Sequence, residues 1–376
     1  MIASTLRGRF ERLMEPADVR VDGDRPWDVR IHDERLFARV LATGTLGFGD
    51  AYMDGWWSCG AIDELVCRSA RHRVVGRLGA PIDLLQAGRA HVVNLQTRVR
   101  STRVAHTHYD LGNDLYERML DPTMMYSCGY WANATTLDEA QTAKLDLIAR
   151  KLGLEPGMRV VDIGCGWGGA ARHFADQYGC EVVGLTISVE QAALAQHRCT
   201  DLPVEIRVQD YRDLDERFDR VVSIGMFEHV GHKNHASFME TARRSLADPD
   251  GLMLLHTIGK LDASTRVDPW IAAHIFPNSF IPGASHVTTA AEHARLVLED
   301  WHSFGPDYDP TLMAWHRNVE AAWDQLDPRY DERFRRMWRF YLLASAGAFR
   351  ARTNQLWQLV YSRDGLQNSY RPAGIR

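Results

Sequence analysis

The segment that decides the fold reads Val160-Val-Asp-Ile-Gly-Cys-Gly-Trp-Gly-Gly169. Its short apolar run predicts a buried strand, and the helical pattern that begins at Ala170 predicts a helix directly behind that strand. The turn between the two holds Gly164, Gly166 and Gly168. Glycine tolerates positive φ and close approach of a ligand, and a helix start offers free N–H groups. The segment therefore predicts a strand, a tight turn and a helix, with a ligand bound at the turn.

The spacing of the glycines narrows the class of ligand. They fall as Gly-x-Gly-x-Gly, with Asp162 in the strand just before them. This spacing favours the nucleoside-binding turn of class I S-adenosylmethionine (SAM) methyltransferases over the turn of dinucleotide-binding folds. A glycine-rich turn is weak evidence alone, because both classes use the same physical principle.

The bulk composition limits the classes of function. With 376 residues, 45% of them apolar and 25% charged, the chain has the composition of a globular protein with one large and one smaller domain. A net charge of −5 argues against general nucleic-acid binding, and the six cysteines lack zinc spacing. No apolar run is long enough for a membrane span, and the start lacks the apolar core of a signal peptide. We therefore expect a cytoplasmic protein without a metal site.

Helical and strand patterns alternate after His106. Helices are predicted at 137–152, 170–178, 189–198 and 238–246, and strands at 160–163, 181–185, 204–208, 220–224 and 252–255. This alternation predicts a parallel, doubly wound α/β sheet with ligands at the carboxyl ends of the strands. The predicted fold class is thus a Rossmann-like sheet with a mostly helical lid, preceded by a small N-terminal α+β domain.

The predicted domains are an N-terminal lipid- or membrane-associating domain at 1–90, a linker at 91–105 and a catalytic domain at 106–376. Between Arg68 and Arg103, eight arginines interleave with apolar residues, and Asp83 is the single acid. Such a stretch can lie on an anionic membrane surface. A solvated arginine face between two domains explains the same pattern equally well, so both interpretations stay open.

Polar residues follow the second and third predicted strands. Thr186 and Gln191 come after the second strand, where Gln191 could hold ribose hydroxyls. Asp210, Tyr211 and Arg212 come after the third, where Asp210 could accept from an adenine amino group beside a flanking ring or guanidinium. Each alone could be a helix cap or a surface residue, but their joint position at successive strand ends predicts a nucleoside site.

Two further candidates follow the fourth and fifth strands. Glu228 lies between Phe227 and His229, and His256 follows the fifth strand. A carboxylate in apolar surroundings needs a partner, so Glu228 is hard to explain as a surface residue. A histidine after a buried strand is more often structural, which keeps the assignment of His256 open.

Taken together, these segments resemble the cyclopropane fatty-acyl-phospholipid synthases, a branch of the SAM-dependent methyltransferases. The motifs that carry the resemblance include His108-Tyr-Asp-Leu-Gly-Asn113, Tyr126-Ser-Cys128, the glycine turn, Gly225-Met-Phe-Glu-His-Val-Gly231, Leu255-His-Thr-Ile-Gly259 and Ala346-Gly-Ala-Phe-Arg350. The resemblance extends to Gly47-Phe-Gly-Asp-Ala-Tyr-Met-Asp-Gly-Trp-Trp57 in the N-terminal unit, which the related mycolic acid enzymes lack. This favours the phospholipid branch.

The resemblance implies SAM and bicarbonate as the two small molecules bound. Positions that hold SAM in such enzymes match Tyr126, Ser127, the turn with Asp162, Gly164, Gly166 and Gly168, and Thr186, Gln191, Tyr211 and Arg212. Positions that hold bicarbonate match Cys128, Glu228, His256, the backbone of Ile258, and Tyr308. The implied reaction adds the SAM methyl carbon to a cis double bond of a phospholipid acyl chain, with bicarbonate as the base. A homodimer that associates with the inner face of the cell membrane is also implied.

One position departs from the family pattern. Ser345 stands where the family usually has a cysteine that has been considered an active-site thiol, and a serine cannot match a thiolate as a nucleophile. We favour a structural role for this position, because ring closure needs a base and no covalent adduct. The alternatives are a fatty-acid C-methyltransferase with a methyl-branched product and a SAM- or lipid-binding protein without turnover.

Overall fold

The computed structural model describes residues 2–74, 112–247 and 249–372. These residues divide into two compact units. The first lies within Met1–Val93, Thr265–Pro277 and Tyr308–Asn354, and the second within Asn94–Ser264, Asn278–Asp307 and Gln355–Arg376. Within the described ranges, no helix combines the length and the apolar character needed to cross a bilayer.

The second unit is built on a seven-stranded sheet. Its strands are β3 (Arg159–Ile163), β4 (Glu181–Thr186), β5 (Val204–Val208), β6 (Arg220–Ile224), β7 (Leu252–Lys260), β8 (Val297–Ser303) and β9 (Asn354–Ser362). They are arranged in the order β5-β4-β3-β6-β7-β9-β8. The five strands from β3 to β7 run parallel, and β8 pairs antiparallel with β9. The five strands predicted from the sequence are confirmed, and β8 and β9 are additional.

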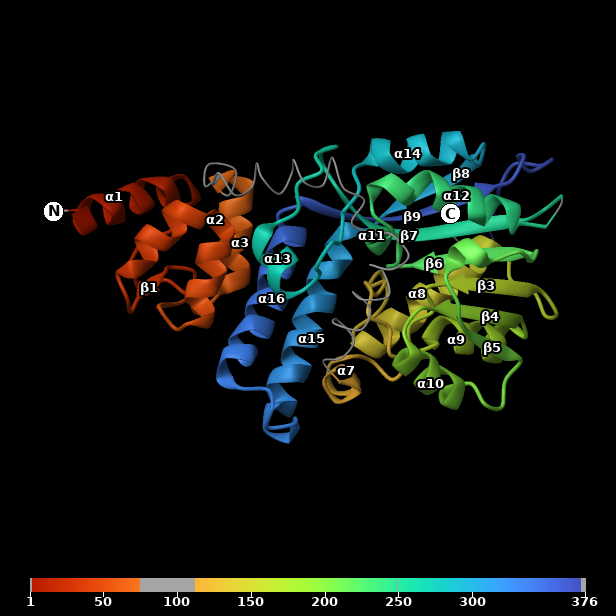
Figure 1. Ribbon diagram of the computed structural model, residues 1–376, viewed down its shortest axis with the longest axis horizontal. Coiled ribbons are helices and arrows are strands. Elements are labelled where there is room, and N and C mark those ends of the chain that lie inside the picture. The colour runs from red at the N-terminus through yellow and green to blue at the C-terminus, as the bar shows by residue number, and fades with distance from the viewer. Residues whose placement is uncertain (1, 75–111, 248, 373–376) are drawn as a thin grey trace. The chain divides into compact units, whose positions relative to one another are not determined.

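Helices cover both faces of this sheet (Figure 1). The helices of this unit are α7 (Asn113–Met119), α8 (Leu137–Leu152), α9 (Gly169–Tyr178), α10 (Val189–Arg198), η2 (Tyr211–Asp213), α11 (Phe227–Val230), η3 (His232–Asn234), α12 (His235–Arg244), α14 (Ala284–His293) and η4 (Gly305–Asp307). Successive strand residues alternate between the faces. Val161 and Val221 pack in one core with residues of α12 and α14, while Val160 and Val222 pack in another with residues of α8 and α9. The predicted doubly wound architecture is therefore confirmed.

The first unit joins segments that lie far apart in the sequence. It contains α1 (Ile2–Met14), η1 (Glu15–Ala17), β1 (Arg30–Ile31), α2 (Arg35–Met53), β2 (Trp57–Ser58), α3 (Ile62–Arg71), α13 (Pro269–His274), α15 (Tyr308–Ala322), η5 (Trp323–Gln325) and α16 (Glu332–Arg350). Helix α16 packs against α2, α3 and α15. A Cβ on Gly347 would lie 2.3 Å from the backbone oxygen of Asp63, so glycine permits the close approach of α16 to α3.

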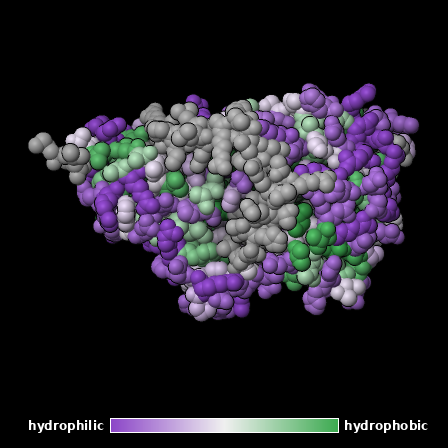
Figure 2. All heavy atoms as spheres, in the orientation of Figure 1, coloured by the Kyte–Doolittle hydropathy of each residue, from purple (hydrophilic) through white to green (hydrophobic). Residues whose placement is uncertain are grey.

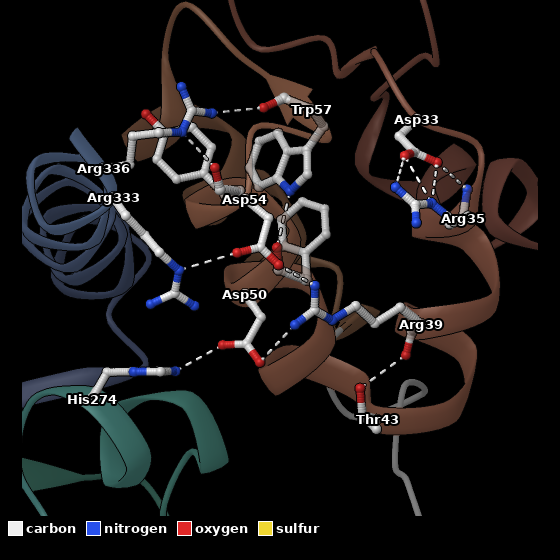
Figure 3. Close-up of polar contacts among 12 residues, drawn as sticks. Asp33, Arg35, Arg39, Thr43, Asp50, Asp54, Trp57, His274, Arg333 and Arg336 are labelled. Carbon is white, nitrogen blue, oxygen red and sulfur yellow. Dashed lines mark hydrogen bonds and ion pairs between the residues drawn. The ribbon is translucent and has the colours of Figure 1, made fainter. Parts of the chain in front are cut away.

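Aromatic packing and ion pairs hold this unit together. Phe340 of α16 lies edge-on to Trp57, with ring centroids 6.2 Å apart, and tilted against Tyr52 at 5.5 Å. Around this core, Figure 3 shows Asp50 of α2 between His274 and Arg39, and Asp50 accepts from His274 Nε2 at 2.7 Å and from Arg39 Nη2 at 3.1 Å. The unit therefore depends on contacts between α2 and helices more than 200 residues later.

This division differs from the predicted domains. The prediction places residues 265–277 and 308–354 in the catalytic domain, whereas their helices pack with the N-terminal ones in the first compact unit. Sequence position cannot show this, because the interactions join residues that are distant along the chain. The predicted linker at 91–105 lies outside the described residues, as does most of the arginine-rich stretch. The role assigned to each domain remains a prediction.

Candidate active site

The glycine turn has the backbone geometry that its spacing predicts. Gly164, Gly166 and Gly168 have φ values of 88°, 54° and 78°, a region that favours glycine. A Cβ on Gly164 would lie 2.5 Å from Met226 Cγ, whereas one on Gly166 would meet no atom within 4 Å. The turn connects β3 to α9. It therefore leaves open space at Gly166, three residues before α9 begins, where a bound nucleoside cofactor could approach the backbone.

Asp162 lies beneath this turn. Its side chain is buried in β3, and Oδ1 has no hydrogen-bond partner in the described part of the chain. Burial raises the pKa of Asp162 to about 7, although the positive charge of Lys144 acts in the opposite direction. Because a buried acceptor without a partner is costly, Asp162 has spare hydrogen-bonding capacity beside the turn.

The structure brings Thr186 and Gln191 together, as their positions after one strand suggest. Thr186 Oγ1 lies 3.1 Å from Gln191 Oε1 and donates to it, and Ser188 caps α10 through the N–H of Gln191. All three side chains are buried. The end of β4 and the start of α10 thus form one fixed polar unit at the carboxyl edge of the sheet.

The residues after β5 have partners within the chain. Arg212 donates to Asp210 through Nε at 2.8 Å and Nη2 at 2.5 Å. The ring of Tyr211 packs edge-on against Phe238 of α12 at 5.2 Å, and burial raises its pKa to about 12. Asp210 is therefore a member of an ion pair, and Tyr211 is largely a core residue. Their predicted contacts with the adenine remain a prediction.

Two exposed valines flank these strand ends. Val189 at the start of α10 is 60% exposed, and Val208 at the end of β5 is 53% exposed. In the space-filling view, hydrophobic side chains gather over the region of α10 on an otherwise largely hydrophilic part of the surface (Figure 2). A planar apolar ring bound at this edge would cover such residues. The sequence analysis did not select them, because an isolated exposed valine carries no motif.

Two side chains of helix α8 donate hydrogen bonds to Ser127. Lys144 Nζ donates to Ser127 Oγ at 2.9 Å, and Gln141 Nε2 donates to the Ser127 backbone oxygen at 2.8 Å. The Ser127 Cβ lies 3.9 Å from the position of a Cβ on Gly225, the residue that follows β6. Ser127 is therefore fixed at the carboxyl edge of the sheet, where SAM is predicted.

Lys144 is the central charge of this region, and the sequence analysis missed it. Burial lowers its pKa to about 8, against the opposing effect of the nearby Asp121, Cys128 and Asp162. Its side chain is fully buried. The sequence does indicate that Lys144 is buried, because Lys144 lies four residues from both Ala140 and Ile148, on the buried stripe of an amphipathic helix. A lysine on such a stripe needs a polar partner inside the protein.

Glu228 connects the ends of β6 and β7. Its Oε1 accepts from the backbone N–H of Ile258 at 2.6 Å, and its Oε2 has no partner among the residues that the structure describes. Burial raises the pKa of Glu228 to about 7, while the Ile258 N–H acts to lower it. The unpartnered oxygen can accept a hydrogen bond from a bound group or, when protonated, donate one.

His256 lies on β7, opposite Ile224 of β6 in the parallel register. Its ring is 1% exposed, with Nδ1 3.3 Å from Gln358 Nε2. No described residue is a partner of Nε2. Burial, together with Lys144 and Lys151, holds the pKa of His256 well below its usual range, so the ring is neutral. Gln358 is a further residue that the sequence analysis missed.

The remaining predicted residues fall into two groups. Cys128 is fully buried, with Sγ 3.2 Å from the Gly129 backbone oxygen, and Tyr126 packs edge-on against Tyr116 at 5.3 Å. Tyr308 and Ser345 belong to the other compact unit. There, the Tyr308 ring stacks on Phe349 at 4.4 Å, and Ser345 is partly buried in α16.

The second unit therefore combines a nucleoside-type turn with buried polar atoms that have no partner among the described residues, and Glu228 Oε2 and His256 Nε2 at the ends of β6 and β7 are among them. Such atoms are rare in folded proteins and commonly face a bound group. Glu228 Oε2 can accept a hydrogen bond, and His256 Nε2 can donate or accept one according to the tautomer. In the described part of the chain, no three His, Cys, Asp or Glu side chains are grouped so as to hold a metal ion.

Comparisons with known proteins agree with this arrangement. The family model described as mycolic acid cyclopropane synthetase matches residues 96–359. The cyclopropane-fatty-acyl-phospholipid synthase of Escherichia coli (strain K12) is 49% identical over 362 residues, which cover 96% of this chain and 94% of that enzyme. The identity therefore extends through both compact units.

Two solved structures are similar in fold. The cyclopropane synthase MmaA2 from Mycobacterium tuberculosis is 34% identical, with a TM-score of 0.66, and the match covers 72% of this chain and 100% of that one. The mycolic acid cyclopropane synthase CmaA1, solved in complex with SAH and CTAB, is 34% identical with a TM-score of 0.65, over 69% of this chain and 98% of that one.

Proposed function

The chain belongs to the mycolic acid cyclopropane synthetase family, and from this membership we propose that it is a SAM-dependent cyclopropane-fatty-acyl-phospholipid synthase. The observation that carries the proposal is the identity of 49% to the Escherichia coli enzyme over nearly the whole length of both chains. The geometry of the second unit supports it independently, because the unit has a nucleoside-type turn beside a buried polar site.

The residues present fit SAM. Open backbone at Gly166 and the start of α9 can face the cofactor, and Ser127 is held at the same sheet edge by Lys144. Thr186 with Gln191 would bind the ribose, and Asp210, Tyr211 and Arg212 would bind or flank the base. Excluding water from this edge favours methyl transfer, because a desolvated nucleophile and electrophile meet without competing hydration.

The residues present also fit a small protonated anion such as bicarbonate. When bound, SAM supplies the methyl carbon and bicarbonate supplies the base that removes one of its protons, so that a cyclopropane ring closes. Glu228 Oε2 and His256 Nε2 are the buried atoms available to hold the anion. Cys128, the Ile258 backbone and Tyr308 complete the proposed set. Ser345 would be structural.

Chain length favours a phospholipid substrate. The match to the MmaA2 structure uses all of that protein but 72% of this chain, whereas the match to the Escherichia coli enzyme uses 96%. Most residues of this chain that have no counterpart in MmaA2 thus have counterparts in the Escherichia coli phospholipid enzyme. A phospholipid acyl chain lies inside a bilayer, so the enzyme would act at the inner face of the cell membrane, in the cytoplasm. The homodimer is proposed from the family resemblance alone.

Fatty-acid profiling of a host that lacks cyclopropane lipids tests the proposal. Expression of the chain should produce cyclopropane acyl chains at the expense of unsaturated ones. A methyl-branched product without a ring would instead identify a fatty-acid C-methyltransferase. Purified protein that binds SAM but does not consume it with unsaturated liposomes and bicarbonate would be a binding protein.

Binding to anionic liposomes at increasing salt tests the membrane contact. Loss of binding at high salt would support contact through arginines such as Arg68 and Arg71, since salt screens exposed charges. Binding that does not respond to salt would assign the contact to apolar residues. Sedimentation equilibrium of the full chain tests the homodimer directly.

A further inference from the structure

The His256 ring has a specific partner on the neighbouring strand. Gln358 of β9, the strand next to β7 in the sheet, places its Nε2 3.3 Å from His256 Nδ1. Gln358 is fully buried and His256 is 1% exposed. Water therefore cannot compete for this contact, and the amide determines the hydrogen-bonding state of Nδ1.

The chemistry of the two groups decides the direction of the bond. Gln358 Nε2 is the amide atom in contact with Nδ1, while Oε1 has no partner among the described residues. In this orientation the amide nitrogen can only donate, so Nδ1 accepts. A neutral imidazole that accepts at Nδ1 carries its proton on Nε2. Burial and the charges of Lys144 and Lys151 keep the pKa of His256 well below its usual range, which maintains the neutral ring.

The protonated nitrogen has no partner among the described residues. His256 Nε2 is buried and unsatisfied, as is Glu228 Oε2. Glu228 binds the N–H of Ile258, two residues after His256 on the same strand. The Glu228 carboxyl group therefore contacts β7 only two residues from His256, toward the carboxyl end of that strand.

We propose that Gln358 is a positioning residue that fixes the Nε2–H tautomer of His256 and thereby makes His256 a hydrogen-bond donor to the base anion. The proposal rests on the proposed function for the identity of that anion. With Glu228 Oε2 as an acceptor, the pair suits an anion that has both acceptor oxygens and an O–H group. Bicarbonate has both, whereas nitrate has acceptors alone.

The tautomer can be measured without turnover. Nitrogen-15 spectra of histidine-labelled full-length protein distinguish Nδ1–H from Nε2–H rings, and a His256→Gln sample identifies the signals of His256. The wild type should have the Nε2–H form. An Nδ1–H form in the wild type would overturn the proposal without any variant.

Two variants test the role of the amide. Gln358→Glu replaces the donor with a carboxylate acceptor, so the ring should change to the Nδ1–H form. The KM for bicarbonate should then rise roughly 10- to 100-fold, as is typical when a group behind a ligand is changed. Gln358→Leu removes the donor, and both tautomers should appear. The dissociation constant for SAM should stay within about twofold in both, since the change acts on the anion.

Gln355→Leu is the matched control. Gln355 lies on the same strand, three residues before Gln358, with its Oε1 accepting from Trp357 Nε1 at 3.1 Å. An odd spacing places it on the opposite face, so this variant should retain the His256 tautomer and the KM for bicarbonate. An unchanged tautomer and KM in Gln358→Glu would overturn the proposal. Wild-type turnover that does not respond to bicarbonate would instead overturn the anion in the proposed function, together with the assigned acceptor of His256.

Discussion

Glu228 and Ile258 are joined by a 2.6 Å hydrogen bond, in which the backbone N–H of Ile258 donates to Glu228 Oε1. The bond connects the end of β6 to β7, and the second carboxyl oxygen has no partner in the described residues. It shows how a helix of four residues, α11, places a carboxyl group at the carboxyl edge of the sheet.

Glu228→Gln should retain SAM binding and lose most turnover. The amide preserves the size of the side chain but changes the hydrogen bonds that Oε2 can offer to the anion. We expect kcat to fall by roughly 10² and the dissociation constant for SAM to change less than about threefold. Calorimetric titration and SAM consumption measure the two. A variant with full turnover would remove Glu228 from the mechanism.

The difference in free energy of unfolding between the wild type and Glu228→Gln should depend on pH. Burial raises the pKa of Glu228 from 4.5 to about 7, so the folded protein binds this proton more tightly than the unfolded chain. This stabilisation is complete below pH 4.5 and is lost as the pH rises through 7. Relative to Glu228→Gln, the wild type should lose about 3 kcal/mol over this interval. Urea denaturation at several pH values measures the difference, and a difference independent of pH would refute a raised pKa.

Lys144→Met should weaken SAM binding. An ammonium can only donate, so Ser127 Oγ accepts from Lys144, and the Ser127 hydroxyl proton is left to donate to another group, which we predict to be the cofactor. Without this constraint we expect the dissociation constant for SAM to rise roughly tenfold. Lys151→Met is the control, because Lys151 is equally buried but pairs with Asp300 at 3.1 Å. Equal loss of SAM affinity in the two variants would assign the effect to stability alone.

Comparing Gly164→Ala with Gly157→Ala distinguishes the effect of backbone strain from the effect of a side chain that blocks the glycine turn. Their φ values are similar, 88° and 83°, so the backbone strain of alanine should cost roughly 1 kcal/mol at either position, and the close contact at 164 adds to this cost. A Cβ at 164 would lie 2.5 Å from Met226 Cγ, whereas a Cβ at 157 would meet nothing within 4 Å. Calorimetry should therefore show weakened SAM binding in Gly164→Ala alone. Unchanged SAM binding in Gly164→Ala would contradict the role of this turn.

Asp50→Asn should destabilise the first unit. Asp50 accepts from His274 and Arg39, whose side chains are about one quarter exposed (Figure 3). We expect a loss of about 1–2 kcal/mol in the free energy of unfolding, because two donors lose a charged acceptor. Asp33→Asn is the control, since its partner Arg35 is 72% exposed and such pairs contribute less than about 1 kcal/mol. Thermal unfolding of the full chain measures both, and equal losses would show that the partners of Asp50 do not matter.

Local patterns predicted much of the second unit because its strands β3 to β7 are short, apolar and separated by turn residues. Strand β9 was not predicted, because Gln355 and Gln358 interrupt its apolar run. Gln358 is a buried polar residue, and its burial is explained by its contact with His256 on another strand. The residues next to Gln358 in the sequence cannot predict this contact. The same holds for Lys144, whose phase on α8 indicates burial but not its partner.

The sequence by itself determined the glycine turn, the parallel sheet and the family, because these depend on periodicity and on motifs of a few consecutive residues. The tertiary structure alone decided which helices join the N-terminal residues in one unit, that Gln358 contacts Nδ1 of His256, and that Lys144 donates to Ser127. These depend on contacts between residues from 17 to more than 200 positions apart. Such contacts form only when the core brings distant segments together, since local conformational preference does not specify the partner of a buried polar group.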